Sequence, residues 1–140
     1  SLLQVYETPR RGSPIVLACP AEEQHEIGLL LVALFLARRA WPVLYLGPNV
    51  PADDLRTVVQ HVQPRLVILS ATTEETARHL VETTEMLAAL AEPRPRLAYG
   101  GQAFDRPSQA PRTMLGTYLG PDARTAADRT DALLGAVPPT

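Results

Sequence analysis

The stretch that decides the fold is "IVLACPAEEQHEIG", residues 15–28. It opens with five apolar residues, continues through a polar segment with two adjacent carboxylates and a histidine, and ends at Gly28. A short apolar run without polar alternation is typical of a strand buried on both faces of a parallel sheet. The apolar stretch that follows predicts a helix over roughly residues 25–40. The pattern therefore predicts a strand, a polar loop and a helix, which together begin a β-α-β unit.

The same alternation recurs along the chain. Leu55, Val58 and Val62 follow the i, i+3, i+7 spacing of a helix face. Pro51 is suited to a helix start, and a Thr72-x-x-Glu75 capping box predicts another start. Further start and stop signals are Pro121 after Gly120, and Pro93 and Pro95 at the end of the third helix. Four more apolar runs are expected to be strands, at residues 43–47, 66–70, 97–101 and 116–120.

Five strands separated by helices predict an α/β fold, a flavodoxin-like (Rossmann-like) doubly wound sheet of five parallel strands in the order 2-1-3-4-5. The first helix is apolar nearly all round, so we expect it to meet a second partner, either a preceding segment or another copy of the chain. Residues 1–13 are interpreted as the end of a preceding helix, in "LLQVYE", and a linker. Residues 14–137 are the domain, and residues 138–140 are a tail.

Composition narrows the classes of function. Thirteen basic and fifteen acidic residues give a net charge of -2, which provides no electrostatic footprint for direct nucleic-acid contact by this domain. The single cysteine, Cys19, excludes an internal disulfide and favours a reducing compartment. No apolar run is long enough to span a bilayer. We therefore expect a cytoplasmic domain that does not contact membranes.

Ligands of doubly wound sheets bind outside the carboxyl ends of the strands, where three strands deliver unusual residues. Glu23 precedes His25 by two positions and is placed to orient one ring nitrogen, an arrangement that fixes a metal-binding tautomer. His61 and His79 are expected on helices away from this loop, so a zinc site built from protein side chains is not expected. A single imidazole is sufficient when a macrocycle already holds the metal.

Each of these residues also has a simpler interpretation. A lone histidine in a loop is usually solvated, and Gly28 suits a tight strand-to-helix turn, although a glycine there also leaves room for a ligand. Thr72 suits a helix cap, whereas Ser70 is a small polar group at the rim. The Gly100-Gly101 pair suits a turn, or a flat group lying against the backbone. Together these residues favour a binding site, because they fall at the ends of successive strands.

Glu23-x-His25-x-x-Gly28, Ser70-x-Thr72 and Gly100-Gly101 resemble the motifs of the cobalamin-binding domain, Asp-x-His-x-x-Gly, Ser-x-Leu and Gly-Gly. The resemblance covers residues 14–135. Glu23 replaces the common Asp, and Thr72 stands where Leu is usual. The segments "EEQHEIG", "LYLGPNVPADDL" and "GGQAF" most resemble the sequences of MerR-type, cobalamin-dependent, light-sensing transcriptional regulators.

The resemblance implies that cobalamin binds with its own base displaced and with His25 as the lower axial cobalt ligand, oriented by Glu23. The cofactor tail would pass Gly28, Ser70 would bond the base end, and Gly100 and Gly101 would let the ligand lie close. The end of the last strand, Tyr118, Leu119 and Gly120, would line the same edge. Adenosylcobalamin is the expected form, with methylcobalamin and hydroxocobalamin as alternatives.

The resemblance further implies a sensory domain and not an enzyme. The chain carries no nucleophile–base constellation, which agrees with this interpretation. In such regulators a helical bundle and a DNA-binding domain precede the cobalamin domain, and loss of the adenosyl group in light rearranges the cap and the oligomer. A homo-oligomer is therefore an expected partner. The alternative is the cobalamin-carrying domain of a corrinoid methyltransferase or mutase.

Overall fold

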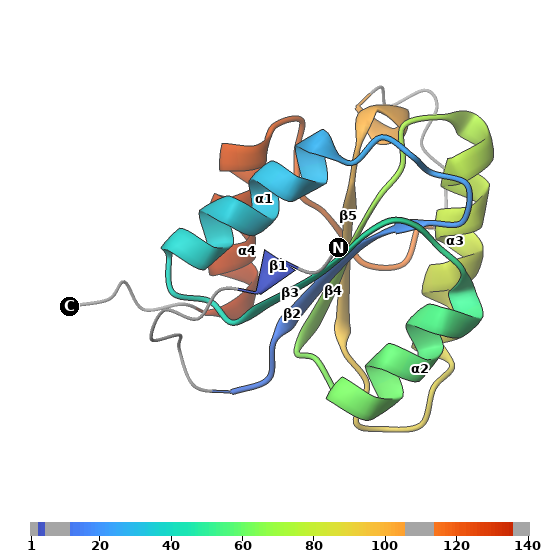
Figure 1. Cartoon of the computed structure of the whole chain (residues 1–140), viewed down its shortest axis with the longest axis horizontal. Coiled ribbons are helices and arrows are strands. Elements are labelled where there is room, and N and C mark those ends of the chain that lie inside the picture. The colour runs from blue at the N-terminus through green and yellow to red at the C-terminus, as the bar shows by residue number, and fades with distance from the viewer. Residues whose placement is uncertain (1–2, 5–11, 106–113, 136–140) are drawn as a thin grey trace.

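The computed structural model of the chain describes residues 3–4, 12–105 and 114–135. Its strands are β1 (Leu3–Gln4), β2 (Ile15–Pro20), β3 (Val43–Val50), β4 (Leu66–Ser70), β5 (Arg96–Gly100) and β6 (Thr117–Tyr118). Its helices are α1 (Ile27–Arg38), α2 (Ala52–Val62), α3 (Glu74–Ala88) and α4 (Ala123–Leu134), with a short 3-10 helix, η1, at Gln102–Phe104. Figure 1 shows the elements in chain order.

The strands form one sheet in the order β1-β3-β2-β4-β5-β6. The last five pair in parallel, in the order 2-1-3-4-5 of the predicted strands, so the predicted fold and topology are confirmed. β1 pairs antiparallel with the outer edge of β3. Residues 3–4 are thus strand and not the helix end that the sequence predicted, because their backbone bonds to the open edge of β3. The rest of "LLQVYE" and the tail at 138–140 lie outside the described residues.

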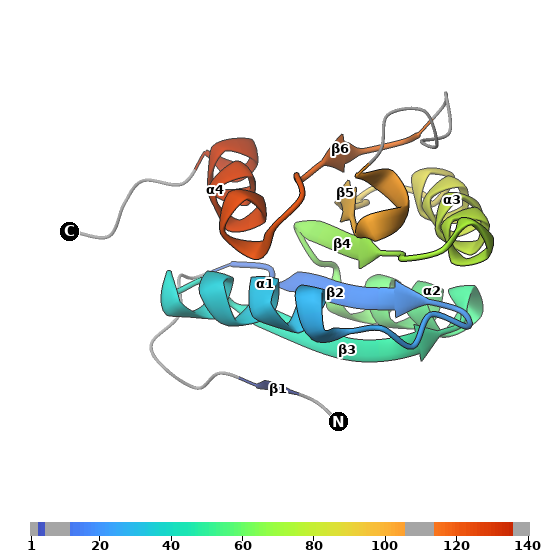
Figure 2. The same ribbon diagram turned by 90° about the horizontal axis from the view of Figure 1, so that it is seen from above.

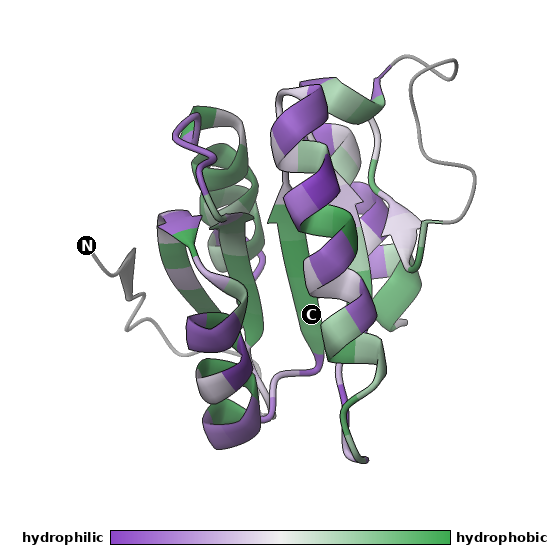
Figure 3. Cartoon of the chain, turned by 90° about the vertical axis from the view of Figure 1, so that its right-hand side faces the viewer, coloured by the Kyte–Doolittle hydropathy of each residue, from purple (hydrophilic) through white to green (hydrophobic). Residues whose placement is uncertain are grey.

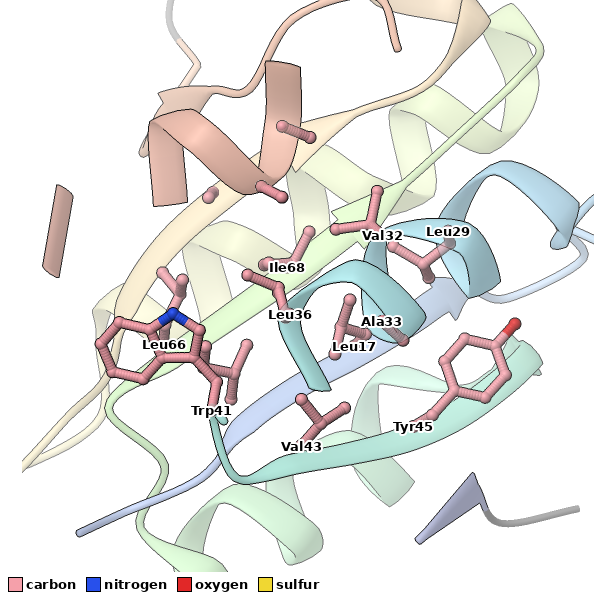
Figure 4. Close-up of a cluster of buried hydrophobic side chains, with 14 of the residues drawn as sticks. Leu17, Leu29, Val32, Ala33, Leu36, Trp41, Val43, Tyr45, Leu66 and Ile68 are labelled. Atoms are coloured by element: carbon pink, nitrogen blue, oxygen red, sulfur yellow. The ribbon is translucent and has the colours of Figure 1, made fainter. Parts of the chain in front are cut away.

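The helices cover both faces of the sheet, α1 and α4 on one side and α2 and α3 on the other (Figure 2). Successive residues of a strand point to opposite faces, so Leu17 joins the cluster under α1 while Val16 joins the one under α2 and α3. Figure 4 shows the first cluster, with Leu36 of α1 packed above Leu17 and beside Trp41. The strands at the centre of Figure 3 are correspondingly hydrophobic.

Helix α1 has apolar side chains on two sides, as the sequence predicted. Leu29, Val32 and Leu36 are buried against the sheet. Ile27 is 75% exposed and Leu31 44% exposed. The spacing of these exposed residues, i and i+4, places them on one stripe of the helix surface.

Three helix starts were predicted from proline and capping signals. Pro51 is the N-cap of α2, as expected. The capping box of α3 lies one residue later than predicted, with Thr73 and Thr76 as its partners, because Thr72 is bonded elsewhere. The N-cap of α4 is Asp122, just after the predicted Gly-Pro start. In the part of the chain that the structure describes, no helix combines the length and the apolar character that crossing a bilayer requires.

Candidate functional site

The loop between β2 and α1 presents His25 to solvent. Its side chain is 77% exposed. Its Nδ1 lies 3.3 Å from Oε2 of Glu23 and 3.4 Å from the hydroxyl of Thr72. With Nδ1 turned to the carboxylate as a donor, Nε2 carries the lone pair and faces away from the protein. Among the described residues, Nε2 has no hydrogen-bond partner.

Glu23 is buried behind this histidine, with only 1% of the residue exposed. Its carboxylate accepts bonds from the backbone N–H of Thr72 at 2.5 Å and of His25 at 3.1 Å, and from the Thr76 hydroxyl at 2.6 Å. The Thr72 hydroxyl lies 2.9 Å from Oε2 and 3.0 Å from Oε1 of the same carboxylate. Burial on its own would raise the pKa of Glu23, but the bonds from Thr76, Thr72 and His25 outweigh it and hold this pKa below its ordinary value. Glu23 is therefore a fixed anion.

The loop is tied to β3 on its other side. The backbone N–H of Asn49 donates to the Glu23 carbonyl at 2.8 Å, and Asn49 Oδ1 accepts from the N–H of Glu22 at 2.8 Å. The Tyr45 hydroxyl donates to Oε1 of Glu26 at 2.6 Å. Backbone and side-chain bonds on both flanks thus fix the path of the chain around His25.

Cys19 lies directly beneath the loop. It is fully buried, and its thiol donates to the His25 carbonyl at 3.7 Å. Burial, followed by the nearby carboxylates of Glu23 and Glu26, raises the pKa of Cys19 to about 12. The thiol is therefore neutral and acts as a small packing group, not as a nucleophile.

Beside His25 opens a cavity of about 640 Å³. The cavity lies where the strands β4, β5 and β6 end, between the first turns of α1 and α4. Eight of the residues predicted at this edge line it: His25, Gly28, Ser70, Thr72, Gly100, Gly101, Leu119 and Gly120. Glu23 does not line it and stands behind His25.

Tyr118 is the predicted residue that the structure does not bring to the cavity. It packs on Tyr99, with ring centroids 5.8 Å apart, and its hydroxyl donates to Asp105 at 2.8 Å. Burial and this carboxylate raise the pKa of Tyr118 to about 12. The side chain of Tyr118 lies on the α3 side of the sheet, whereas the next residue, Leu119, lines the cavity on the α1 side.

The glycines of the cavity differ in what requires them. Gly28 lies within the first turn of α1, and a Cβ added to it would meet nothing within 4 Å. The backbone therefore does not demand glycine there, and its missing side chain leaves the cavity open. Gly101 has φ +105°, and a Cβ on it would come within 2.2 Å of the Ala71 carbonyl oxygen. Gly101 is thus required by the packing of β5 against β4.

Ser70 ends β4 at the floor of the cavity. The residue is 8% exposed. Every fully enclosed side-chain nitrogen or oxygen in the described part of the chain has a hydrogen-bond partner. The Ser70 hydroxyl has none among the described residues, so it must open onto the cavity, where it can donate to or accept from a ligand.

Sequence reasoning missed three contributions. Thr76 was not singled out, because its place in the first turn of α3 depends on Thr73, and not Thr72, being the cap. Ala123 and Ala126 of α4 and its N-cap Asp122 also line the cavity, and only the i, i+3 spacing of the two alanines hinted at this. His79 was expected away from the loop, which is wrong: its Nε2 lies 2.8 Å from the Glu22 carboxylate.

Comparison with known proteins finds similarity along nearly the whole chain. The family model described as the B12 binding domain matches residues 13–134. The HTH-type transcriptional repressor CarH of Myxococcus xanthus is 40% identical over 105 residues, which are 74% of this chain and 34% of that protein. CarA of the same organism is 40% identical over 72 residues, 49% of this chain and 25% of that protein. The chain thus spans about a third or less of these relatives.

Solved structures of cobalamin-binding proteins share the fold. A cobalamin-binding protein from Desulfitobacterium hafniense superposes with a TM-score of 0.74 at 23% identity, covering 89% of this chain and 59% of that one. The methanol:cobalamin methyltransferase complex MtaBC from Methanosarcina barkeri gives a TM-score of 0.74 at 25% identity, covering 95% and 50%. The family match extends over nearly the whole domain, and the chain belongs to the B12 binding domain family.

Proposed function

We propose that the chain binds a cobalamin with Nε2 of His25 as the lower axial ligand of cobalt, and that it is the sensory domain of a cytoplasmic transcriptional regulator. The observation that carries the binding mode is the arrangement of His25. Its Nδ1 is held by a buried carboxylate and its Nε2 is free beside an open cavity.

The residues fit a cobalamin better than a metal ion held by protein side chains alone. In the described part of the chain, the one group of three side chains placed to share a metal ion does not include His25. A corrin supplies a cobalt ion whose lower axial position is open to an imidazole once the cofactor's own base is displaced. The displaced tail would enter the cavity past Gly28, and Ser70 offers its hydroxyl there. We expect adenosylcobalamin, with methylcobalamin and hydroxocobalamin as alternatives.

Thr72 takes a role that its position in the resemblance did not suggest. Both its N–H and its hydroxyl bond to Glu23, so it holds the carboxylate that orients His25. A leucine at this position would keep the backbone N–H bond and lose the bonds from the hydroxyl. Glu23, which is longer than the usual Asp, and Thr72 are thus matched to each other.

The regulatory role rests on the relatives. At 40% identity, two proteins named as HTH-type transcriptional repressors are more similar in sequence than the methyltransferase complex at 25%. We propose that the parent protein carries a helical bundle and a DNA-binding domain, that it forms a homo-oligomer, and that it responds to light. The alternative, a cobalamin carrier for a corrinoid enzyme, is favoured by the fold shared with that complex.

The experiment is a visible spectrum of the chain with hydroxocobalamin and with adenosylcobalamin, in darkness and after illumination. We expect a base-off, histidine-ligated spectrum that His25→Ala abolishes. His61→Ala is the matched control, because His61 is exposed on α2 and does not line the cavity. An identical spectrum for the His25 variant and the unchanged chain would refute the ligand assignment. A substrate-converting domain in the parent would favour the enzyme.

A further inference from the structure

A second group of metal-binding side chains lies outside the cavity. Glu22, Glu75 and His79 each offer one ligand atom, and these atoms all lie within 4.8 Å of one another. His79 Nε2 is already 2.8 Å from Oε2 of Glu22. None of the three lines the cavity, and their side chains take no part in the hydrogen bonds that hold His25 and Glu23.

Two elements build this cluster. Glu75 and His79 are four residues apart on α3, so they share one face of the helix. Glu22 comes from the β2–α1 loop with φ +70°, a left-handed conformation that is uncommon for a residue other than glycine. The bond from its N–H to Asn49 Oδ1 holds that conformation. The loop is thereby held with the Glu22 carboxylate against α3.

We propose that Glu22, Glu75 and His79 form a binding site for a divalent transition-metal ion of the Zn²⁺ type. An imidazole with two carboxylates suits Zn²⁺ and not Ca²⁺ or Mg²⁺, which prefer oxygen ligands only. Tetrahedral ligands at about 2.0–2.1 Å from zinc stand roughly 3.4 Å apart. The Glu22 and His79 atoms, now 2.8 Å apart, would therefore separate slightly, and all three ligand atoms already lie within 4.8 Å of one another. Three protein ligands leave the fourth position to water.

The ion would join the same two elements that Glu23 and Thr76 join. Glu22 adjoins Glu23 in the loop, and Glu75 adjoins Thr76 on α3. A ligand that binds only the folded state raises its stability by mass action. Zinc would therefore stabilise the chain and hold the loop of His25 against α3, independently of any cobalamin.

The test exploits the three histidines of the sequence. In a His25→Ala/His61→Ala background without an affinity tag, His79 is the only histidine left. We expect isothermal titration with ZnCl2 to show one saturable site in this background. His79→Ala in the same background should weaken binding at least tenfold, and Glu75→Gln and Glu22→Gln should each weaken it. Glu74→Gln is the matched control, because Glu74 neighbours Glu75 on α3 and is outside the cluster.

The zinc measurements do not depend on whether the cobalamin proposal is correct, because the background protein lacks His25. Circular dichroism of each variant shows whether it remains folded, and His79→Gln serves if His79→Ala does not. The absence of a saturable site, or equal affinity with and without His79, overturns the proposal. Equal weakening by Glu74→Gln and Glu75→Gln also overturns it, since the effect would then be one of net charge.

Discussion

The hydroxyl of Thr76 donates to Oε1 of Glu23 at 2.6 Å, and both residues are almost fully buried, at 5% and 1% exposure. This bond joins α3 to the loop that presents His25, across 53 residues of sequence. A buried carboxylate that loses one such donor keeps its charge with less compensation. The position of His25 therefore depends on a helix that does not itself reach the cavity.

Thr76→Val removes that hydroxyl and keeps the shape of the side chain. Because the bond goes to a charged acceptor, we expect a loss of about 1.5–3 kcal/mol in the free energy of unfolding, measured by urea denaturation. Thr130→Val is the control: Thr130 is equally buried, but its hydroxyl only donates to the Ala126 carbonyl one turn back. It should cost less than about 1 kcal/mol. Equal losses of unfolding free energy in the two variants would mean that the bond to Glu23 stabilises the fold no more than an ordinary helix bond does.

The lowered pKa of Glu23 makes stability depend on pH in a definite direction. A carboxyl whose folded-state pKa lies below its unfolded value stabilises the fold fully above the unfolded value, about 4.3. That contribution is lost as the pH falls through the folded-state pKa. Unfolding free energies of the chain and of Glu23→Gln, measured from pH 7 to pH 3, should therefore converge toward the acid end. A constant difference across this range would show that the pKa of Glu23 is not lowered.

The fold was predictable because it depends on periodic apolar runs, and the five parallel strands lie where those runs are. Most of the cavity lining was predictable too, since strand ends and their glycines collect at one edge. The orientation of Tyr118 was not predictable, because a shift of one position along a two-residue strand turns a side chain to the other face of the sheet. Leu119, and not Tyr118, faces the cavity. Thr76 and His79 depend on where α3 begins, and the prediction placed its cap one residue early.

Gly100 and Gly101 should respond in opposite ways to alanine. A Cβ on Gly101 would meet the Ala71 backbone at 2.2 Å, in a left-handed conformation, so Gly101→Ala should cost more than about 2 kcal/mol. At Gly100 the nearest atom would be the Gly120 carbonyl oxygen at 3.8 Å. Gly100→Ala should therefore leave the unfolding free energy unchanged or raise it by about 0.5 kcal/mol. Thermal or urea unfolding of both variants checks this, and equal losses would argue against the close approach of β5 and β4.

Cys19 should be unreactive in the folded chain. Its pKa of about 12 and its complete burial leave almost no thiolate at pH 8. Because Cys19 is the only cysteine, a disulfide reagent that releases a coloured thiol reports on it alone. We expect the rate in buffer to be at least about a hundredfold below the rate in concentrated guanidinium. Similar rates in the two solvents would place the thiol in an open environment and contradict its packing role beneath the loop.

Two substitutions of Gly28 should affect stability and cobalamin binding separately. Its Cβ position is empty space at the edge of the cavity, and its place in α1 makes glycine unfavourable for the helix. Gly28→Ala should therefore raise the unfolding free energy of the chain by up to about 1 kcal/mol. Gly28→Leu should fill the mouth of the cavity and lower the affinity for hydroxocobalamin at least tenfold in a visible-absorbance titration. Gln60→Leu, which adds the same side chain to the exposed face of α2, should bind as the unchanged chain does. If Gly28→Leu retains full affinity, the cofactor tail does not pass this residue, and the absence of a side chain there must have another cause.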